Sequence, residues 1–163
     1  MKKTIIAGLA FSALALGTAS AQPAQTTVRI PAVSPYTVYV GGGFGAQNAL
    51  HLGFAINNIA RLSDTVGVGL RVNAGLGGAY NTNVSADALF SFPALPVTVY
   101  AGPTIGYDTG NATFPSGLWG GAVAGITVPV FQAIGLYGEG NLRYNFNTGT
   151  TGFGVRAGLN FSL

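Results

Sequence analysis

The stretch Gly135–Phe146, GLYGEGNLRYNF, decides the fold because its residues alternate between two kinds. Every second residue from Leu136 onward is Leu, Gly, Tyr or Phe, whereas the residues between them include Glu139 and Arg143. A period of two is that of a β-strand whose two faces meet different surroundings. The stretch therefore predicts a strand with one apolar face and one polar face.

Seven further segments of the mature chain show the same period. Tilted strands of about 9–11 residues cross a bilayer, and single-chain bacterial barrels have an even number of strands. We therefore predict an all-β fold, an eight-stranded antiparallel up-and-down transmembrane β-barrel over residues 36–163. The seven segments lie at residues 36–46, 49–59, 66–79, 84–92, 97–107, 118–129 and 153–162.

Charged residues indicate which face of each strand points to lipid. They make up only 7% of the chain, against roughly a quarter in ordinary soluble domains. Those within the predicted strands share a face with Gly, Asn, Ser and Thr, which is the reverse of an aqueous β-sandwich. The apolar face is therefore predicted to point outward and the charges into the lumen. The predicted lumen charges are Arg71, Asp87, Glu139, Arg143 and Arg156.

Aromatic residues cluster toward the ends of the predicted strands. β-propensity alone explains aromatic residues within strands but not this bias to the ends. Transmembrane barrels carry girdles of aromatic side chains at both membrane interfaces, so the bias predicts two such belts. The predicted belt residues are Tyr36, Phe44, Phe92, Tyr107, Trp119, Tyr144, Phe146, Phe153 and Phe161.

Residues 1–21 have the pattern of a cleaved secretory signal peptide. Lys2 and Lys3 form a positive start, Ile5–Leu16 is a short apolar run, and Ala19-Ser20-Ala21 suits the peptidase. The apolar run is shorter than the roughly 20 residues that a transmembrane helix needs. Residues 22–35, which contain three prolines, are predicted to be an extended linker. Sec export and a bacterial outer-membrane location follow from this interpretation.

Composition argues against several classes of function. The chain has no Cys, and beyond the leader five Arg stand against four acidic residues without a basic patch, so nucleic-acid binding is not expected. Gly41-Gly42-Gly43 precedes no predicted helix, so it lacks the context of a phosphate-binding loop. We find no metal-ligand spacing and predict no cofactor.

A lipid-modifying enzyme ranks third among the possible functions of a barrel of this size, after a structural role and a narrow pore. Acyl transfer needs a nucleophile and a base within hydrogen-bond reach. His51 is the only His, and the nearest hydroxyls in sequence, Ser34 and Ser63, fall near the other end of the predicted barrel. We therefore predict no catalytic residue and interpret His51 as a lumen or rim side chain.

The inward charges allow two readings of the lumen. Isolated buried charges would cost several kcal/mol each, so a plug of paired Arg, Glu and Asp side chains is expected. A hairpin loop at residues 147–152 would place Arg143 almost opposite Arg156, where the two would repel. The alternative is a narrow, anion-preferring pore, although eight strands normally leave room only for side chains.

Several short sequence segments resemble those of the small outer-membrane barrel group that includes the OmpA membrane domain, OmpX and the opacity-type proteins. They are Tyr39–Phe44 (YVGGGF), Tyr100-Ala101-Gly102, Leu136–Gly140 (LYGEG) and a final Asn160–Leu163 (NFSL). The resemblance covers about residues 36–163 and implies the barrel fold rather than an activity. The expected role is structural or surface-interacting. The expected partners are outer-membrane lipid, the barrel-assembly machinery and a cell-envelope or surface-layer component.

Overall fold

The computed structural model describes residues 34–78, 81–94, 96–110 and 116–163. The predicted signal peptide, residues 1–21, lies outside the described residues, as does the predicted linker up to residue 33. The described part consists of eight β-strands. They are β1 (Tyr36–Gly45), β2 (Leu50–Ser63), β3 (Val66–Leu76), β4 (Thr82–Ala94), β5 (Val97–Asp108), β6 (Gly117–Pro129), β7 (Ile134–Asn145) and β8 (Thr151–Ser162).

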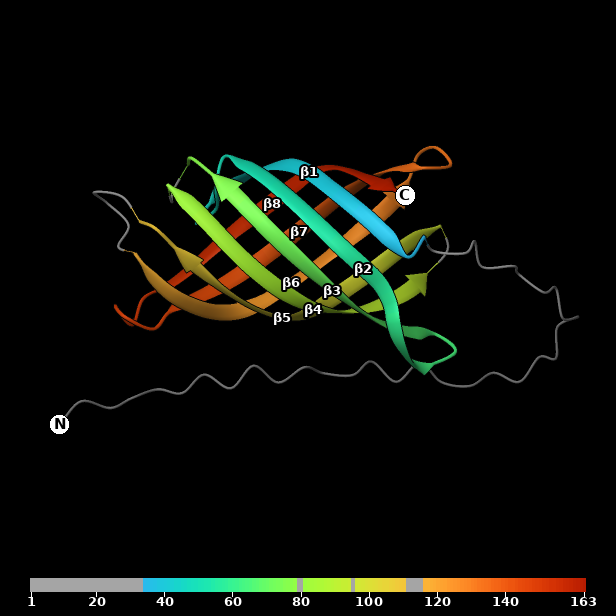
Figure 1. The fold of residues 1–163 in the computed structure, drawn as a ribbon, viewed down its shortest axis with the longest axis horizontal. Helices are drawn as coiled ribbons and strands as arrows, with labels where there is room; N and C mark the ends of the chain where they lie inside the picture. The colour runs from blue at the N-terminus through green and yellow to red at the C-terminus, as the bar shows by residue number, and fades with distance from the viewer. Residues whose placement is uncertain (1–33, 79–80, 95, 111–115) are drawn as a thin grey trace, which may run out of the picture.

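The strands form one closed antiparallel barrel (Figure 1). Each strand pairs with the next in the chain, and β8 closes the sheet against β1 through pairs such as Val40↔Leu159. Closure leaves the wall without open edges, so backbone donors and acceptors pair within it. The predicted eight-stranded antiparallel up-and-down barrel is confirmed.

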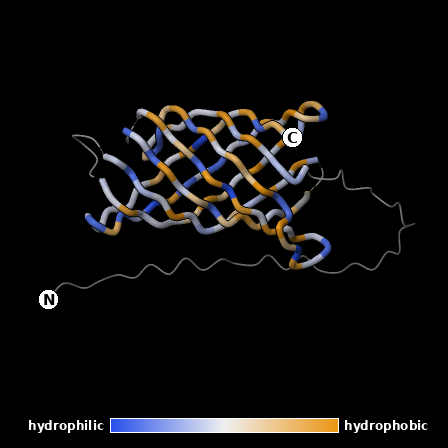
Figure 2. Tube along the Cα trace, viewed as in Figure 1, coloured by the Kyte–Doolittle hydropathy of each residue, from blue (hydrophilic) through white to orange (hydrophobic). Residues whose placement is uncertain are grey.

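The wall has opposite polarity on its two faces. Figure 2 shows hydrophilic and hydrophobic residues alternating along the strands. In β3, Leu70 and Val72 are exposed on the outside, whereas Arg71 and Asn73 between them are buried in the lumen. The described ranges contain no helix that is long and apolar enough to cross a membrane.

The two ends of the barrel differ in what closes them. We call the end with Tyr36 and Ser162 the terminal end; its turns join β2 to β3, β4 to β5 and β6 to β7. The other end is the loop end, where the remaining four connections lie. At the loop end the short β1–β2 connection bends inward, so that Gln47 and Asn48 are buried.

The β2–β3 hairpin is longer than predicted. The sequence predicted strands over residues 49–59 and 66–79, but β2 continues to Ser63 and the turn is only Asp64-Thr65. Its ladder is irregular between Ile56 and Ala60 and again between Arg61 and Ser63. Figure 1 shows this hairpin bending away from the wall at the terminal end.

The register of β7 against β8 also differs from the expectation. The strands are paired as far as Tyr144↔Thr151, so the connection lies about two residues earlier in the chain than the predicted loop at residues 147–152. Arg143 therefore faces Gly152, and Arg156 faces Glu139. The predicted juxtaposition of Arg143 and Arg156 was wrong, because the shift places an acid opposite Arg156 instead.

Candidate functional site

The polar lumen of the barrel is the candidate site, because it holds the buried charges of the chain. The five sequence-predicted lumen charges all lie there, between 0% and 5% exposed. The structure divides them into two groups. Arg71, Asp87, Glu139 and Arg156 form a central cluster at mid-height, and Arg143 belongs to a second group at the loop end.

Glu139 is the hub of the central cluster. Its carboxylate accepts two hydrogen bonds from Arg71, across Nη1–Oε2 at 2.8 Å and Nη2–Oε1 at 3.2 Å. Arg156 Nη2 lies 2.5 Å from Oε1, and the Tyr100 hydroxyl donates to Oε2 at 2.7 Å. Such bidentate, charge-assisted contacts are the strongest hydrogen bonds in proteins.

Arg71 joins the two opposite walls of the barrel. It faces Asp87 across the β3–β4 ladder and lies 2.7 Å from its Oδ2, while Glu139 reaches it from β7. The guanidinium also stands against aromatic rings, 5.1 Å from the centroid of Tyr39 and 5.6 Å from that of Tyr100. The cluster is charge-balanced, with two arginines and two acids.

A second group closes the lumen at the loop end. Arg143 Nη1 lies 3.4 Å from Asp108 Oδ1, and its Nη2 donates to Gln47 Oε1 at 3.1 Å. Asn83 donates to the same Asp108 oxygen at 2.5 Å. The guanidinium stacks on the Trp119 ring, 4.2 Å from its centroid. We call Gln47, Asn83, Asp108, Trp119 and Arg143 the loop-end cluster.

Three members of the loop-end cluster, Gln47, Asn83 and Asp108, were missed by the sequence prediction. The predicted strand stopped at residue 107, but β5 extends to include Asp108, whose side chain faces the lumen as those of Tyr100 and Thr104 do. Continuing the period of two by one more inward position would have found it. No sequence signal indicated that the short connection at Gln47 folds into the lumen.

The prediction that Trp119 belongs to an outer aromatic belt was wrong. Its side chain is 1% exposed and lies inside the barrel. The physical reason is its partner on β5, Gly106, because a Cβ there would lie 2.5 Å from the indole. The missing side chain of Gly106 leaves the space that the ring fills.

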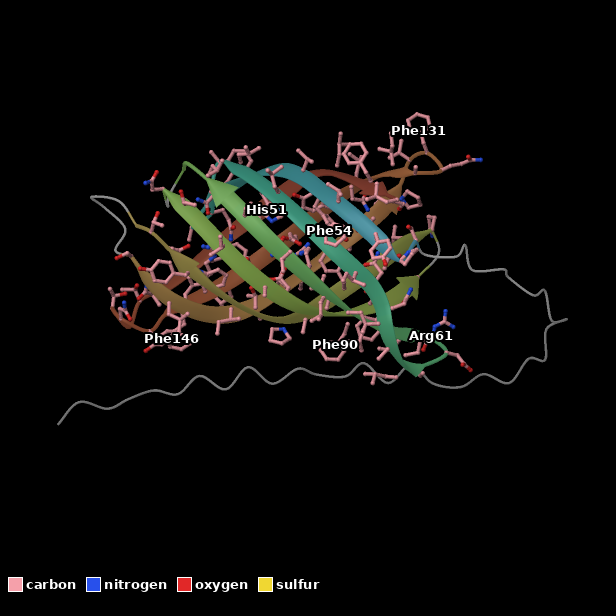
Figure 3. The ribbon with its side chains drawn as sticks, viewed as in Figure 1. His51, Phe54, Arg61, Phe90, Phe131 and Phe146 are labelled. Carbon is pink, nitrogen blue, oxygen red and sulfur yellow. The ribbon has the colours of Figure 1, made fainter. Side chains whose placement is uncertain are left out.

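The other predicted belt residues lie on the outer wall. Figure 3 shows Phe146 pointing away from the barrel at one end and Phe131 at the other. Phe161 is half-buried and the remainder are exposed. The exposed ones are Tyr36, Phe44, Phe92, Tyr107, Tyr144, Phe146 and Phe153.

His51 is held in the lumen between two polar partners (Figure 3). Its Nδ1 lies 3.0 Å from the Tyr137 hydroxyl and its Nε2 lies 3.0 Å from Asn73 Oδ1. Since the amide oxygen can only accept, Nε2 carries a proton and donates, and Nδ1 accepts from Tyr137. Both ring nitrogens are thus engaged by groups that position the ring. Among described residues, no group of three His, Cys, Asp or Glu side chains could hold a metal ion.

Comparisons with known proteins give little beyond the fold. No protein-family model matches the chain. No curated protein matches it either. Among solved structures, it is similar to the N-terminal β-barrel domain of Pseudomonas aeruginosa OprF, with 17% sequence identity and a TM-score of 0.48. That similarity covers 77% of this chain and 96% of the OprF domain.

Proposed function

We propose that this protein is an outer-membrane β-barrel that spans the bilayer and has a structural or surface-interacting role, with a lumen closed to solutes. The observation that carries the proposal is the polarity of the wall. Large apolar side chains such as Leu70, Ile105 and Leu136 are half exposed outside, while the arginines are buried inside. This arrangement suits a wall surrounded by lipid, since lipid solvates the apolar face and closure satisfies the backbone.

The strands have the dimensions that this role requires. They are 10 to 14 residues long, and tilted strands of about 9–11 residues span a bilayer. Aromatic side chains such as Phe44 and Phe153 at the loop end, and Tyr36 and Phe92 at the terminal end, stand where the two interfaces would lie. Outer-membrane lipid and the barrel-assembly machinery are the partners that this location implies.

The filled lumen favours a closed barrel and argues against a pore. The central cluster reaches from β3 to β7, and the loop-end cluster covers it on one side. A permeating ion would have to separate the Arg71–Glu139 pair, whose members are both fully buried. We therefore propose that the connections at the loop end face the outside and contact a cell-envelope or surface-layer component, because recognition residues commonly lie on loops.

A depth-matched pair of arginines tests the membrane assignment. Leu70→Arg at mid-height should destabilise the inserted barrel by about 2–4 kcal/mol, whereas Leu76→Arg near the loop end should cost about 0–1 kcal/mol. The two leucines share a strand and a face and are 52% and 49% exposed, so depth is the variable that differs. Folding is measured by the shift in gel mobility between unheated and heated samples. Equal loss at both positions would argue against a lipid-facing wall.

Conductance in planar bilayers separates the closed barrel from the pore. The purified protein should give no steady single-channel current. A reproducible anion-selective current would favour the alternative, a narrow solute pore lined by Arg71, Arg143 and Arg156. Both results would remain compatible with an outer-membrane location, so this measurement addresses the lumen alone.

A further inference from the structure

The terminal end of the lumen contains a half-open cavity of about 470 Å³. This volume lies within the range of about 300–1,000 Å³ that small-molecule sites occupy. Tyr39, Leu89 and Tyr100 form its floor and separate it from the central cluster. The cavity is therefore open to the terminal end and blocked toward the loop end.

One wall of the cavity presents three hydroxyl groups on neighbouring strands. Ser91 on β4 is the cross-strand partner of the floor residue Tyr100, and Thr98 on β5 faces Thr127 on β6. All three side chains are half-buried. Within the described part of the chain, none of these hydroxyls makes a side-chain hydrogen bond, so they are available to a ligand.

The opposite wall carries a buried side-chain amide whose oxygen could accept a further hydrogen bond. Asn160 on β8 lines the cavity and is only 7% exposed, and its Oδ1 has no hydrogen-bond partner among the described residues. A buried polar atom without a partner is uncommon in folded proteins and requires an explanation such as a ligand or water. Nearby, Asn57 Nδ2 fixes the wall by donating to Thr37 Oγ1 at 2.8 Å and to the Ser34 carbonyl at 2.9 Å.

The charges around the cavity favour a neutral ligand. The central cluster behind the floor is balanced, with two arginines and two acids paired to one another. Among the described residues that line the cavity, the charged ones are Arg61 and Asp64. They have opposite signs and are exposed on the β2–β3 hairpin. The described lining therefore carries one positive and one negative side chain and no group of like charges that would select a charged ligand.

We propose that this cavity binds a neutral saccharide of one or two rings, which enters from the terminal end. Its hydroxyl groups would bond to Ser91, Thr98, Thr127 and Asn160, and the sugar would rest above the floor without stacking on the tyrosine rings, which are only 3–6% exposed. The floor is rigid, because Arg71 stacks on both tyrosines and Tyr100 is hydrogen-bonded to Glu139. This inference goes beyond the proposed function and does not depend on whether the lumen conducts.

An NMR titration of the exported protein tests the proposal. The protein is kept in dodecylphosphocholine, since a sugar-headed detergent would compete. Maltose and N,N′-diacetylchitobiose are the neutral probes, and glucose 6-phosphate is the charged comparison. We expect saturable shifts of the Ser91, Thr98, Thr127 and Asn160 amide signals with at least one neutral probe. The signals of Asp108 and Trp119 at the loop end should not move.

A matched pair of variants assigns the binding to the cavity hydroxyls. Thr98→Val with Thr127→Val removes two hydroxyls while conserving shape and should weaken binding by about tenfold. Thr104→Val makes the same change on β5 beyond the floor and should leave affinity unchanged. If the double variant does not fold, the location of the shifts in the unmodified protein still decides the question.

Four results would overturn the proposal. The first two are the absence of saturable shifts with both neutral probes and tighter binding of glucose 6-phosphate than of either neutral sugar. The other two are equal affinity in the double variant and the unmodified protein, and shifts confined to residues outside the cavity.

Discussion

The middle of the lumen and its loop end are both closed by arginine ion pairs, but the two closures are built differently. In the central cluster, Arg71 and Glu139 are fully buried, make two hydrogen bonds to each other and join opposite walls. In the loop-end cluster, Arg143 makes one longer contact to Asp108 and relies on Gln47 from a connection and on stacking. The comparison suggests that the central cluster holds the walls together, while the loop-end cluster covers the opening.

Removing the charge of Glu139 should produce the largest effect. Glu139→Gln leaves Arg156 without the acid that it faces across the β7–β8 ladder. Breaking a buried ion pair in this way costs about 3–5 kcal/mol. The free energy of unfolding, measured by urea titration of the protein in lipid vesicles, should fall by that amount.

Two further variants control this measurement. Asp64→Asn removes an acid from the exposed β2–β3 turn and should leave the unfolding midpoint unchanged. Arg156→Met in the Glu139→Gln background should restore part of the stability, because it removes the orphaned charge while Arg71 keeps Asp87. An unchanged midpoint for Glu139→Gln itself would show that water screens the lumen charges, which would weaken the comparison and favour the pore.

The equivalent change in the loop-end cluster should have a smaller effect. Asp108→Asn removes the acid that Arg143 contacts, but Arg143 keeps its hydrogen bonds to Gln47 and Asn141 and its stacking on Trp119. A hydrogen bond to a charged group contributes about 1.5–3 kcal/mol, and we expect a loss in that range in the same urea titration. A loss as large as that of Glu139→Gln would remove the distinction between the two clusters.

Truncation of Gln47 should have a still smaller effect on stability. Gln47→Ala removes one hydrogen bond to Arg143, which keeps Asp108 and Asn141, so the free energy of unfolding should fall by about 1.5 kcal/mol, the lower end of the range for a hydrogen bond to a charged group. Gln132→Ala on the exposed β6–β7 turn is the matched control and should be neutral. Because the central cluster stays intact, planar-bilayer recordings of Gln47→Ala should show no steady current. A current in this variant would mean that the loop end, rather than the middle, closes the lumen.

The smallest expected effect is the change in fluorescence of the single Trp when the surrounding lipids are brominated. Trp119 faces the lumen, so brominated lipids should leave its fluorescence nearly unchanged. Moving the indole outward, by Leu118→Trp together with Trp119→Phe, should give strong quenching because Leu118 is exposed on the outer face. Strong quenching in the unmodified protein would restore the belt assignment of Trp119.

The fold could be predicted from the sequence because a period of two is a local property. In GLYGEGNLRYNF each residue's face follows from its position in the alternation, and the structure places Glu139 and Arg143 in the lumen accordingly. Pairing between strands is not local. The approach of Arg156 to Glu139 depends on where the β7–β8 turn lies in the chain, which one sequence does not specify to within a residue or two.

The errors at the loop end have a physical reason of the same kind. Trp119 has the residue type of a belt but the parity of the lumen, and only the absence of a side chain at Gly106 on the neighbouring strand makes room for it. At this position the place in the alternation of the strand therefore predicts the direction of the side chain better than the residue type does. The inward fold of Gln47 depends on how a short connection closes, for which the alternation gives no information.

The irregular β2–β3 hairpin has a consequence for the behaviour of the protein before it reaches its final location. A regular hairpin that projects from a barrel could pair edge to edge with another copy and begin aggregation. Here the ladder is interrupted twice, and Asn58 has a positive φ of 53°, so the strand cannot offer a continuous template to a neighbour. The exposed charge of Arg61 on the same segment adds repulsion between copies.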